Sequence, residues 1–524
     1  MTVVLGYCKI TQSMDNFGSG LKATLTHRFL ETCDKFGNNT AIIDDTGSLT
    51  YAELGAAAKK MAALLTELTP QQNIGILLPT CKEFSIAYFA TLLMGKTPVP
   101  LNFLMSPAQL SYVIKDASLD TVITISPFRN LVEGQINHCV CLDEIKAPIR
   151  KSQESARTNK FVHATQLSRL VGSPEDTAVL LYTSGTTANP KGVILTHKNI
   201  LSVIDGIAPS FKFTHEDVIL GVLPLFHSFA LTVTLALPVC FGAKVVYITR
   251  FSGPRVLELI EKHKITIVAA IPSIFRVMLR TLESSKYDLS SVRLYATGGE
   301  PLPRDIIEDF NAVSLIPLFE GYGLTEASAI VSVNLPDKYK ASTAGQPLPN
   351  IDVRIVDENH NPLPPNTDGE IWIKGPSVMG GYHNLPRHTN EVLTKDGWLK
   401  TGDIGRLDAD GFLKITGRKK DLIIISGENV SPNEIEETLA LHPEVHEVAV
   451  MGVPDKTRGE APKAYISLAK DATLSENYLK DFCRNKLPHY KIPRYFEFRE
   501  NLPKGPTGKI LKRALCVGGE AIRE

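Results

Sequence analysis

Residues 182–192 read YTSGTTANPKG, and no other stretch says as much about the chain. They follow an apolar run, 178–181, whose length and composition suit a buried strand. Glycine lets backbone N–H groups turn toward an anion, hydroxyls add donors, and Lys191 adds a mobile positive charge. A polyphosphate needs these groups, although an ordinary surface loop rich in Ser, Thr and Gly is the commoner source of such composition. The stretch therefore predicts a strand followed by a phosphate loop.

The bulk composition is that of a soluble globular enzyme of more than one domain. The chain has 524 residues, of which 43% are hydrophobic and 21% charged. Lys+Arg and Asp+Glu both number 56, so no global basic field favours a nucleic-acid partner. The first residues lack the features of a signal peptide. The eight cysteines are scattered, which favours reduced thiols and a cytoplasmic location.

One segment, 218–243, contains no Asp, Glu, Lys or Arg and is long enough to span a bilayer. Two prolines and Gly242 break it into shorter pieces. We expect a strand over 218–222, a turn that holds His227, and a buried helix over 229–237. A membrane span is therefore not expected, while peripheral contact with a membrane stays open.

Helical periodicity alternates with short apolar runs in the first half of the chain, which predicts parallel α/β layers. Beyond residue 350, β-rich runs divided by Pro and Gly indicate an antiparallel or barrel-like subdomain. We expect an α/β fold with a large N-terminal domain, 1–419, and a small mobile α+β domain, 420–524. Lys420 is the expected hinge. The clearest early elements are helices at 49–65 and 83–94 and strands at 74–78 and 121–125.

The loop is not a Walker A element, because GxxxxGK[ST] does not occur in the chain. It resembles the phosphate loop YTSGTTGxPKG of the adenylate-forming superfamily. That superfamily includes acyl- and aryl-CoA synthetases, peptide-synthetase adenylation domains and firefly-type luciferases. Ala188 stands where glycine is usual, so the turn there must tolerate a Cβ.

Six further motifs follow in the family's order: 224–228 (PLFHS), 297–301 (TGGEP), 321–326 (GYGLTE), 397–403 (GWLKTGD), 427–436 (GENVSPNEIE) and 502–510 (LPKGPTGKI). Each alone is weak or moderate evidence. A single histidine in an apolar segment more often packs in a core, glycine pairs are common in turns, and a surface lysine is usually only solvated. Together they cover roughly residues 45–515, which makes coincidence a poor explanation.

The resemblance implies an ATP site. In the family the phosphate loop binds the polyphosphate, TGGEP walls the adenine pocket, and the YGLTE motif stacks on adenine, contacts the α-phosphate and holds Mg²⁺. The aspartate of GD contacts the ribose, an arginine contacts ribose and phosphate, and the last lysine binds the α-phosphate and the carboxylate. The corresponding residues here are Thr183, Ser184, Gly185, Thr186, Thr187, Lys191, Gly298, Gly299, Glu300, Pro301, Tyr322, Gly323, Thr325, Glu326, Asp403, Arg418 and Lys509.

The resemblance also implies sites for the acid and the thiol. His227 flanks the carboxylate, and Phe229, Val233 and Ile271 form part of an uncharged acyl wall. The loop with Gly427 and Glu428 helps to form the thiol tunnel, where Ser431 replaces the usual tyrosine. The aspartate that holds a substrate amine in peptide-synthetase domains has no counterpart in this region, which favours an acid without an α-amino group.

The expected reaction has two steps: a carboxylate displaces pyrophosphate from ATP, and a thiol then displaces AMP. The leading interpretation is a fatty acid–CoA ligase that uses ATP, CoA and Mg²⁺. An acyl-AMP ligase or stand-alone adenylation enzyme that loads a carrier protein is the alternative. A degenerate nucleotide-binding protein is disfavoured by the intact Lys191, Glu326, Asp403 and Lys509. Luciferase-like oxygenation has no specific support, and the acid's chain length and the oligomeric state are left open.

Overall fold

The computed structural model describes residues 23–144, 172–183, 189–425, 428–455, 457–469, 472–484, 486–504 and 510–515. Contacts divide this part of the chain into two compact units. The first unit holds the described residues up to Tyr339 together with 347–352 and 374–398. The second holds 340–346, 353–373 and the described residues from Leu399 onward.

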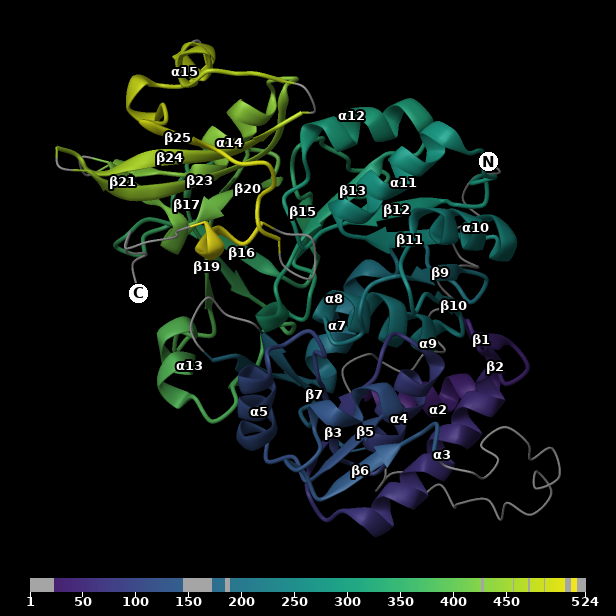
Figure 1. The fold of residues 1–524 in the computed structure, drawn as a ribbon. Helices are drawn as coiled ribbons and strands as arrows, with labels where there is room; N and C mark the ends of the chain where they lie inside the picture. The colour runs from purple at the N-terminus through teal and green to yellow at the C-terminus, as the bar shows by residue number, and fades with distance from the viewer. Residues whose placement is uncertain are drawn as a thin grey trace, which may run out of the picture. The chain divides into compact units, whose positions relative to one another are not determined.

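The largest sheet runs through the first unit in the order β15-β14-β13-β12-β11-β9-β10-β1-β2 (Figure 1). From β13 to β1 every neighbouring pair is parallel. The strands are β1 (Thr40–Asp44), β2 (Gly47–Thr50), β9 (Val218–Gly221), β10 (Lys244–Tyr247), β11 (Ile267–Ala270), β12 (Leu294–Thr297), β13 (Leu318–Tyr322), β14 (Ser332–Val333) and β15 (Gln346–Pro347). Parallel neighbours end at the same edge of a sheet, so the segments that follow β9, β11, β12 and β13 gather there.

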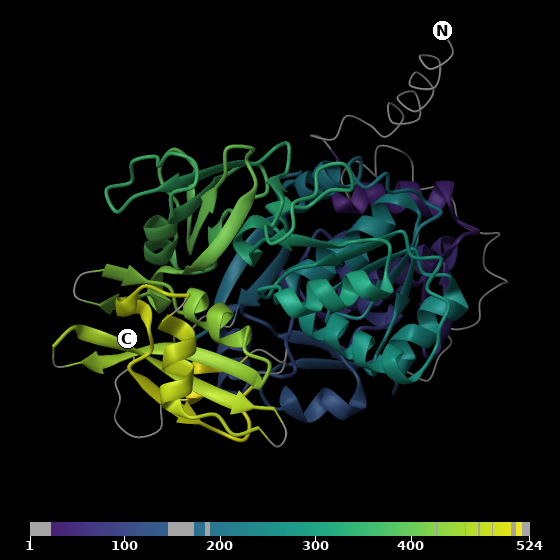
Figure 2. The ribbon, with the colours of Figure 1, turned by 90° about the horizontal axis from the view of Figure 1, so that it is seen from above.

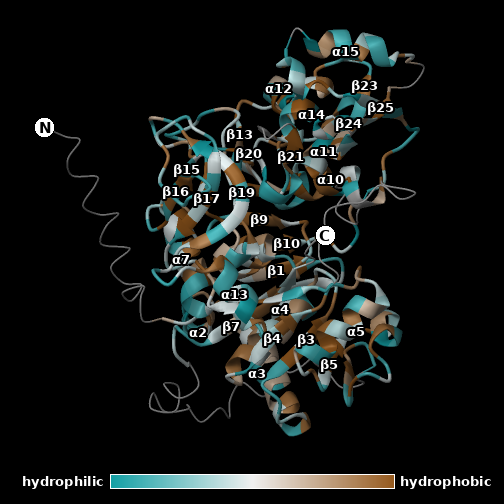
Figure 3. Ribbon diagram, turned by 90° about the vertical axis from the view of Figure 1, so that its left-hand side faces the viewer, coloured by the Kyte–Doolittle hydropathy of each residue, from teal (hydrophilic) through white to brown (hydrophobic). Residues whose placement is uncertain are grey.

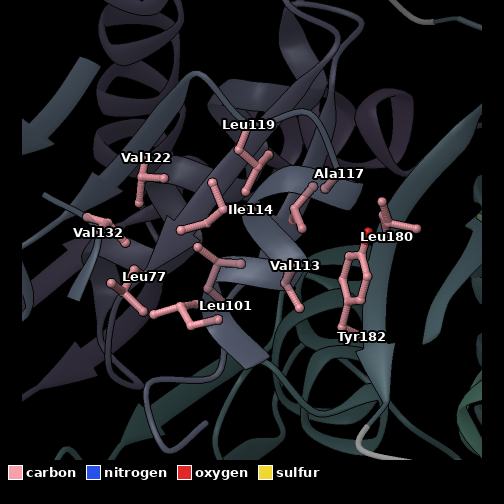
Figure 4. Packing of buried hydrophobic residues seen from close by; sticks show 12 residues of the cluster. Leu77, Leu101, Val113, Ile114, Ala117, Leu119, Val122, Val132, Leu180 and Tyr182 are labelled. Carbon is pink, nitrogen blue, oxygen red and sulfur yellow. The ribbon is translucent and has the colours of Figure 1, made fainter. Parts of the chain in front are cut away.

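A second parallel sheet has the order β4-β3-β5-β6. Its strands are β3 (Asn73–Leu77), β4 (Thr97–Pro100), β5 (Thr121–Thr124) and β6 (His138–Cys141). Leu77 and Val122 on this sheet belong to a buried cluster that also contains Val113 of α5 (Pro107–Asp116) and Leu180 and Tyr182 of β7 (Thr177–Thr183) (Figure 4). The strand that leads to the phosphate loop is thereby anchored in a hydrophobic core.

A third, small sheet contains the two strands that flank the predicted phosphate loop. Its order is β18-β8-β7, with β7 (Thr177–Thr183), β8 (Lys191–Thr196) and β18 (Gly381–Tyr382) all antiparallel to their neighbours. Thr183 pairs with Lys191, so the loop joins the two strands of a hairpin. The sequence predicted β7 but not this hairpin.

Helices cover the sheets of the first unit. They are α2 (Leu25–Lys35), α3 (Tyr51–Leu68), α4 (Lys82–Leu93), α5 (Pro107–Asp116), α7 (His197–Ile207), α8 (Ser228–Ala230), α9 (Leu237–Phe241), α10 (Gly253–His263), α11 (Pro272–Ser284), α12 (Arg304–Val313) and α13 (Pro386–Val392), with the short turns η1 (Ser126–Leu131), η2 (Leu231–Ala236) and η3 (Thr325–Ala327). Thr50 and Glu53 form a reciprocal capping box at the start of α3. Strands of the parallel sheets such as β3 and β5 are mostly hydrophobic, whereas α13 carries hydrophilic residues (Figure 3).

The predicted helix over 229–237 is present but is not one regular helix. It consists of α8, the π-helical turn η2 and α9, and it continues to Phe241. The hydroxyl of Thr234 donates to the carbonyl of Ala230 at 2.8 Å inside this segment. A widened turn leaves the apolar composition unchanged, so hydrophobic periodicity does not reveal it.

The second unit contains two sheets. One has the order β16-β17-β19-β20 and is the β-rich region predicted beyond residue 350. The other, drawn in yellow-green and yellow in Figure 2, has the order β22-β21-β24-β23, with β25 parallel to β24. The elements are β16 (Asp352–Val356), β17 (Gly369–Lys374), β19 (Leu399–Leu407), β20 (Leu413–Arg418), η4 (Lys419–Asp421), β21 (Ile423–Ile425), β22 (Glu428–Val430), α14 (Pro432–Ala440), β23 (Val445–Asp455), β24 (Gly459–Leu468), α15 (Glu476–Arg484), η5 (His489–Lys491), β25 (Tyr495–Phe498) and η6 (Lys512–Ala514).

The α/β fold class is confirmed, and the early elements lie within two residues of their predicted bounds at nearly every end. Among the residues that the structure describes, no helix combines the length and the apolar character needed to cross a membrane. The charge-free segment 218–243 is instead divided among β9, α8, η2 and α9.

His197 provides a test of the packing beside the hairpin. It is the first residue of α7, and its buried Nδ1 accepts a hydrogen bond from the backbone N–H of Leu25 at 3.2 Å. Burial lowers the pKa of His197 from 6.5 to about 4. The unfolded chain therefore binds more protons between these pH values, and the free energy of unfolding falls as the pH drops through them.

We predict that His197→Asn loses less stability than the parent between about pH 6.5 and about pH 4, because the asparagine oxygen still accepts from Leu25 but does not titrate. Urea unfolding midpoints at several pH values would measure the difference. Identical pH dependence in the two proteins would show that His197 is not protonated on unfolding in this range.

Candidate active site

The base of the phosphate loop is held by the β7–β8 hairpin. The Thr183 hydroxyl lies 3.5 Å from the carbonyl oxygen of Lys191, at the limit of a hydrogen bond. The Lys191 ammonium lies 5.2 Å from the centre of the Tyr382 ring. The predicted loop residues Ser184, Gly185, Thr186 and Thr187 lie outside the described residues.

The segments after β12 and β13 meet at the carboxyl edge of the large sheet. A Cβ on Gly298 would lie 3.0 Å from the carbonyl oxygen of Gly321, so the two backbones approach closely. Gly299 has a φ of +83°, and a Cβ there would lie 3.6 Å from the Ile271 side chain, just after β11. The chain then continues through the predicted pocket residues Glu300 and Pro301. Glycine at both positions leaves a flat ligand room to approach the backbone.

Tyr322 ends β13, and the turn that follows it is tightly closed. A Cβ on Gly323 would lie only 1.7 Å from the carbonyl oxygen of Ala329. Ser328 and Ala329 both adopt left-handed conformations, with φ of 58° and 85°. Such strain in non-glycine residues persists only where the surroundings fix it, and it concentrates at functional sites. The turn presents Thr325 and Glu326 from η3.

His227 lies beside this turn. The hydroxyls of Ser228 and Thr325 are 3.2 Å apart, which joins the segment after β9 to the segment after β13. The His227 ring contacts Phe226, with 4.6 Å between ring centres. Burial lowers the pKa of His227 from 6.5 to about 4. The imidazole is therefore neutral near pH 7 and carries no positive charge into the site.

Glu326 is connected to the hairpin through Tyr382. The Tyr382 hydroxyl donates to Glu326 Oε1 at 2.8 Å. Burial, followed by the neighbouring Glu326 carboxylate, raises the pKa of Tyr382 well above its usual value of 10. The phenol therefore stays protonated and remains a donor.

The main chain of segment 376–383 makes hydrogen bonds both to the turn that carries Glu326 and to strand β8. The backbone N–H of Met379 donates to the carbonyl of Glu326, at 2.8 Å. The N–H groups of Gly380 and His383 donate to the carbonyls of Ile194 and Gly192 on β8, at 3.2 and 2.7 Å. The segment thus fixes the Glu326 turn relative to the strand that begins at Lys191.

The predicted acyl wall is apolar. Val233 in η2 is buried, with 6% of its surface exposed, while Phe229 and Ile271 are half-buried. Ala230, Leu231 and Thr234 around them are fully buried. A separate cavity of about 640 Å³ in the first unit is lined by His197 and His383, among others, and by none of the predicted site residues.

The remaining predicted residues belong to the second unit. The guanidinium of Arg418 on β20 lies 3.0 Å from the carboxylate of the buried Asp403 on β19, and the two residues pair across the sheet. Lys420 is exposed in η4, and Glu428 begins β22. Gly427 and Lys509 lie outside the described residues.

Lys504 and Ile510 form an antiparallel bridge on either side of 505–509. Ser431, which stands at the place of the family's tyrosine, donates to the carbonyl of Thr416.

The residues near Glu326 fit a magnesium ion bound together with a polyphosphate. Tyr382 occupies Oε1, and within the described residues Oε2 has no hydrogen-bond partner. The described residues contain no cluster of three or more potential metal ligands. A single carboxylate suits Mg²⁺, which takes one or two protein oxygens and completes its coordination with phosphates and water.

Comparisons with known proteins identify the family of the chain. The AMP-binding enzyme family model matches residues 29–383, and the AMP-binding enzyme C-terminal domain matches residues 434–509. The chain belongs to the AMP-binding enzyme family, so the resemblance seen in the motifs is confirmed.

The relatives act on different acids. A long-chain-fatty-acid–CoA ligase of Bacillus subtilis (strain 168) is 35% identical, over 94% of this chain and 94% of that protein. The 4-coumarate–CoA ligase 1 of Arabidopsis thaliana is 34% identical, over 89% of this chain and 87% of that protein. The o-succinylbenzoate–CoA synthetase of Bacillus subtilis, solved with its acyl-adenylate intermediate, has a TM-score of 0.83 at 31% identity, over 95% of this chain and 99% of that chain. The same enzyme has also been solved with ATP and a magnesium ion, with a TM-score of 0.82 at 32% identity, over 93% of this chain and 98% of that chain.

Two residues beside the predicted set were missed from the sequence. Tyr382 contacts a carboxylate 56 positions earlier in the chain, and Ser228 contacts a hydroxyl 97 positions later. The sequence offered one weak signal, the run Gly380-Gly381-Tyr382, which is an aromatic residue after two conformationally free positions. A contact over such a distance in sequence leaves no local pattern.

We predict that Gly323→Ala displaces the Thr325–Glu326 turn and lowers the rate of adenylate formation at least tenfold. The new methyl group would overlap backbone, which does not yield as a flexible side chain does, at a cost of about 1–3 kcal/mol or more. Pyrophosphate release under single-turnover conditions would measure the effect. Gly380→Ala is the control, since a Cβ there would meet Ile194 at an ordinary 3.9 Å; equal rates for the two variants would contradict the prediction.

Proposed function

We propose that this protein is a fatty acid–CoA ligase acting in the cytoplasm. The reaction class follows from the family: the chain is an AMP-forming acid–CoA ligase that uses ATP and CoA as co-substrates together with Mg²⁺. The fatty-acid assignment and the roles of individual residues go further. They rest on the arrangement of the first unit and, for Asp403, Arg418 and Lys509, on the resemblance to the family.

The observation that carries the residue assignments is the meeting of three segments. The hairpin contributes Lys191, the strained turn contributes Thr325 and Glu326, and the segment after β9 contributes His227. Tyr382 joins the first two segments, and the pair Ser228–Thr325 joins the last two. A cation, a carboxylate and hydroxyl donors that converge in one unit suit a polyphosphate and its magnesium ion.

Two observations support a fatty acid as the substrate. The segment that begins at His227 continues into an uncharged and largely buried helix, 228–241, which is a suitable wall for an alkyl chain. Several of the relatives are long-chain-fatty-acid–CoA ligases. The aromatic acids of other relatives at similar identity are the main competing substrates.

In the proposed first step the carboxylate of the acid attacks the α-phosphorus of ATP, forming an acyl-adenylate and releasing pyrophosphate. Two anions must approach each other, so neutralisation and alignment of charge dominate the barrier. Lys191 and Lys509 supply positive charge, Thr325 donates to the α-phosphate, and neutral His227 borders the carboxylate. Magnesium, when bound at Glu326, screens the charge of the phosphates. Asp403 would accept hydrogen bonds from the ribose hydroxyls, with Arg418 beside it.

In the proposed second step the CoA thiol attacks the acyl-adenylate and AMP leaves. Lys509 has no use in this step, and the thiol needs a route to the carbonyl carbon. A small domain, 420–524, that turns about Lys420 meets both needs by withdrawing Lys509 and bringing in Gly427 and Glu428. The match of a separate C-terminal family model to residues 434–509 supports a domain of this size.

The substrate is tested by a panel of acids of increasing chain length, with 4-coumarate and o-succinylbenzoate included. We predict that saturated acids with long tails give the highest kcat/KM for acyl-CoA formation, because each buried methylene adds about 0.8 kcal/mol. Parallel reactions with an acyl carrier protein in place of CoA test the alternative acceptor. A preference for an aromatic acid would end the fatty-acid proposal and leave the ligase class standing.

Within this panel, Val233→Asp should raise KM for long acids much more than KM for acetate. Val233 is buried, so a carboxylate there would face the alkyl tail without a partner. The KM for ATP and the thermal unfolding temperature serve as controls for a general loss of structure. Equal increases for short and long acids would remove Val233 from the acyl wall.

The division of labour between the two steps is tested by Lys509→Ala. We predict that adenylate formation slows by two to three orders of magnitude, roughly 3–4 kcal/mol, because one charge contact to the transition state is lost. Thioester formation from preformed acyl-adenylate should stay nearly unchanged. Equal slowing of both half-reactions would rule out this role for the lysine.

A further inference from the structure

Tyr382 lies between two groups that the proposed mechanism uses separately. Its hydroxyl donates to Glu326 Oε1 at 2.8 Å, and its ring centre lies 5.2 Å from the Lys191 ammonium. One side chain therefore contacts both the carboxylate assigned to the metal and the lysine assigned to the phosphates.

The backbone holds Tyr382 firmly in this place. Tyr382 pairs with Val193 on β8, and its N–H donates to the hydroxyl of Thr389 at 2.9 Å. Gly381 has a φ of +140°, and a Cβ there would lie 2.8 Å from Thr389 Cγ2. Glycine at this position thus allows α13 to pack directly on the strand that carries Tyr382.

We propose that Tyr382 is a positioning residue for adenylate formation, which orients the Glu326 carboxylate toward the metal and the Lys191 ammonium toward the phosphates. This inference rests on the proposed function, because it takes the metal role of Glu326 as its starting point. Tyr382 itself does not touch the reacting atoms.

The chemistry of the two contacts explains how one residue performs both tasks. A hydrogen bond to Oε1 limits the rotation of the carboxylate, so Oε2 would be the oxygen that holds a cation; partners of metal-binding carboxylates commonly act in this way. The electron-rich face of a phenol ring attracts an ammonium ion within about 6 Å. The ring thus limits the positions of a long, flexible lysine side chain before ATP binds.

The hydroxyl is tested by Tyr382→Phe, which keeps the ring. The measurement is the affinity of Mn²⁺ for the enzyme saturated with a non-hydrolysable ATP analogue, followed by electron paramagnetic resonance. We expect the dissociation constant for Mn²⁺ to rise about tenfold, the usual cost of losing such a partner, and AMP affinity to stay unchanged because AMP binding uses no metal. The matched control is Tyr88→Phe on α4, which removes a buried hydroxyl that donates to the Ala178 carbonyl of β7 at 3.2 Å.

The variant Glu326→Gln tests the metal role of Glu326 separately from the positioning role of Tyr382. If Glu326→Gln weakens Mn²⁺ binding and Tyr382→Phe does not differ from Tyr88→Phe, the positioning role of the hydroxyl is wrong and the metal assignment stands. If Glu326→Gln leaves Mn²⁺ affinity unchanged, the metal assignment fails and the inference fails with it.

The ring is tested by Tyr382→Leu, measured without any divalent ion so that only the lysine contact contributes. We expect the ATP analogue to bind several-fold more weakly to Tyr382→Leu than to Tyr382→Phe. The difference should vanish in a Lys191→Ala background. A difference of the same size in that background would show that the ring acts on packing and not on the lysine.

Discussion

The hydrogen bonds of segment 376–383 connect two parts of the first unit: the turn with Glu326, which follows a strand of the large sheet, and strand β8, which belongs to the small sheet. On one side Met379 bonds to the carbonyl of Glu326, and on the other Gly380 and His383 bond to β8. Asn199 at the start of α7 also donates to the carbonyls of Pro376 and Val378, at 2.8 and 2.9 Å. A few residues thus set the distance between the hairpin and the carboxyl edge of the large sheet. The approach of Tyr382 to both Glu326 and Lys191 depends on that distance.

The electrostatic demand of the reaction explains why this distance matters. A carboxylate and a polyphosphate repel each other, and fixed charges and dipoles lower the barrier only if they are in place before the reaction begins. The strained turn at Ser328 and Ala329 and the closed contact at Gly323 hold Thr325 and Glu326 rigidly. The hairpin holds the base of the phosphate loop in the same way. In the proposed mechanism, rigid backbone therefore supplies the preorganisation, and longer side chains such as Lys191 complete it.

Local chemistry made much of the fold predictable. The helix at α3 was foreseen because Thr50 caps it, and the parallel sheets because short apolar runs alternate with helical periodicity. The motifs around Gly298, Tyr322 and Asp403 were recognised through their resemblance to the family, since each alone is weak or moderate evidence. These predictions depended on neighbours in sequence, which a single chain displays directly.

The features that were missed depend on distant neighbours or on small changes of backbone. The β7–β8 hairpin carries no short turn signal, since a loop of seven residues separates Thr183 from Lys191. The π-helical turn η2 has the same apolar composition as an ordinary helix. Tyr382 reaches Glu326 only because β18 adds to β8, a pairing of residues about 190 positions apart along the chain. Such pairings are decided by the whole fold.

In the proposed mechanism a carboxylate is activated on ATP before any thiol takes part. Isotope exchange between labelled pyrophosphate and ATP tests this most directly, in the presence of Mg²⁺ and a fatty acid and in the absence of CoA. The account predicts that label enters ATP only when the acid is present, and that adding CoA then yields AMP and a thioester. Exchange that requires CoA, or the appearance of ADP as the nucleotide product, would contradict it.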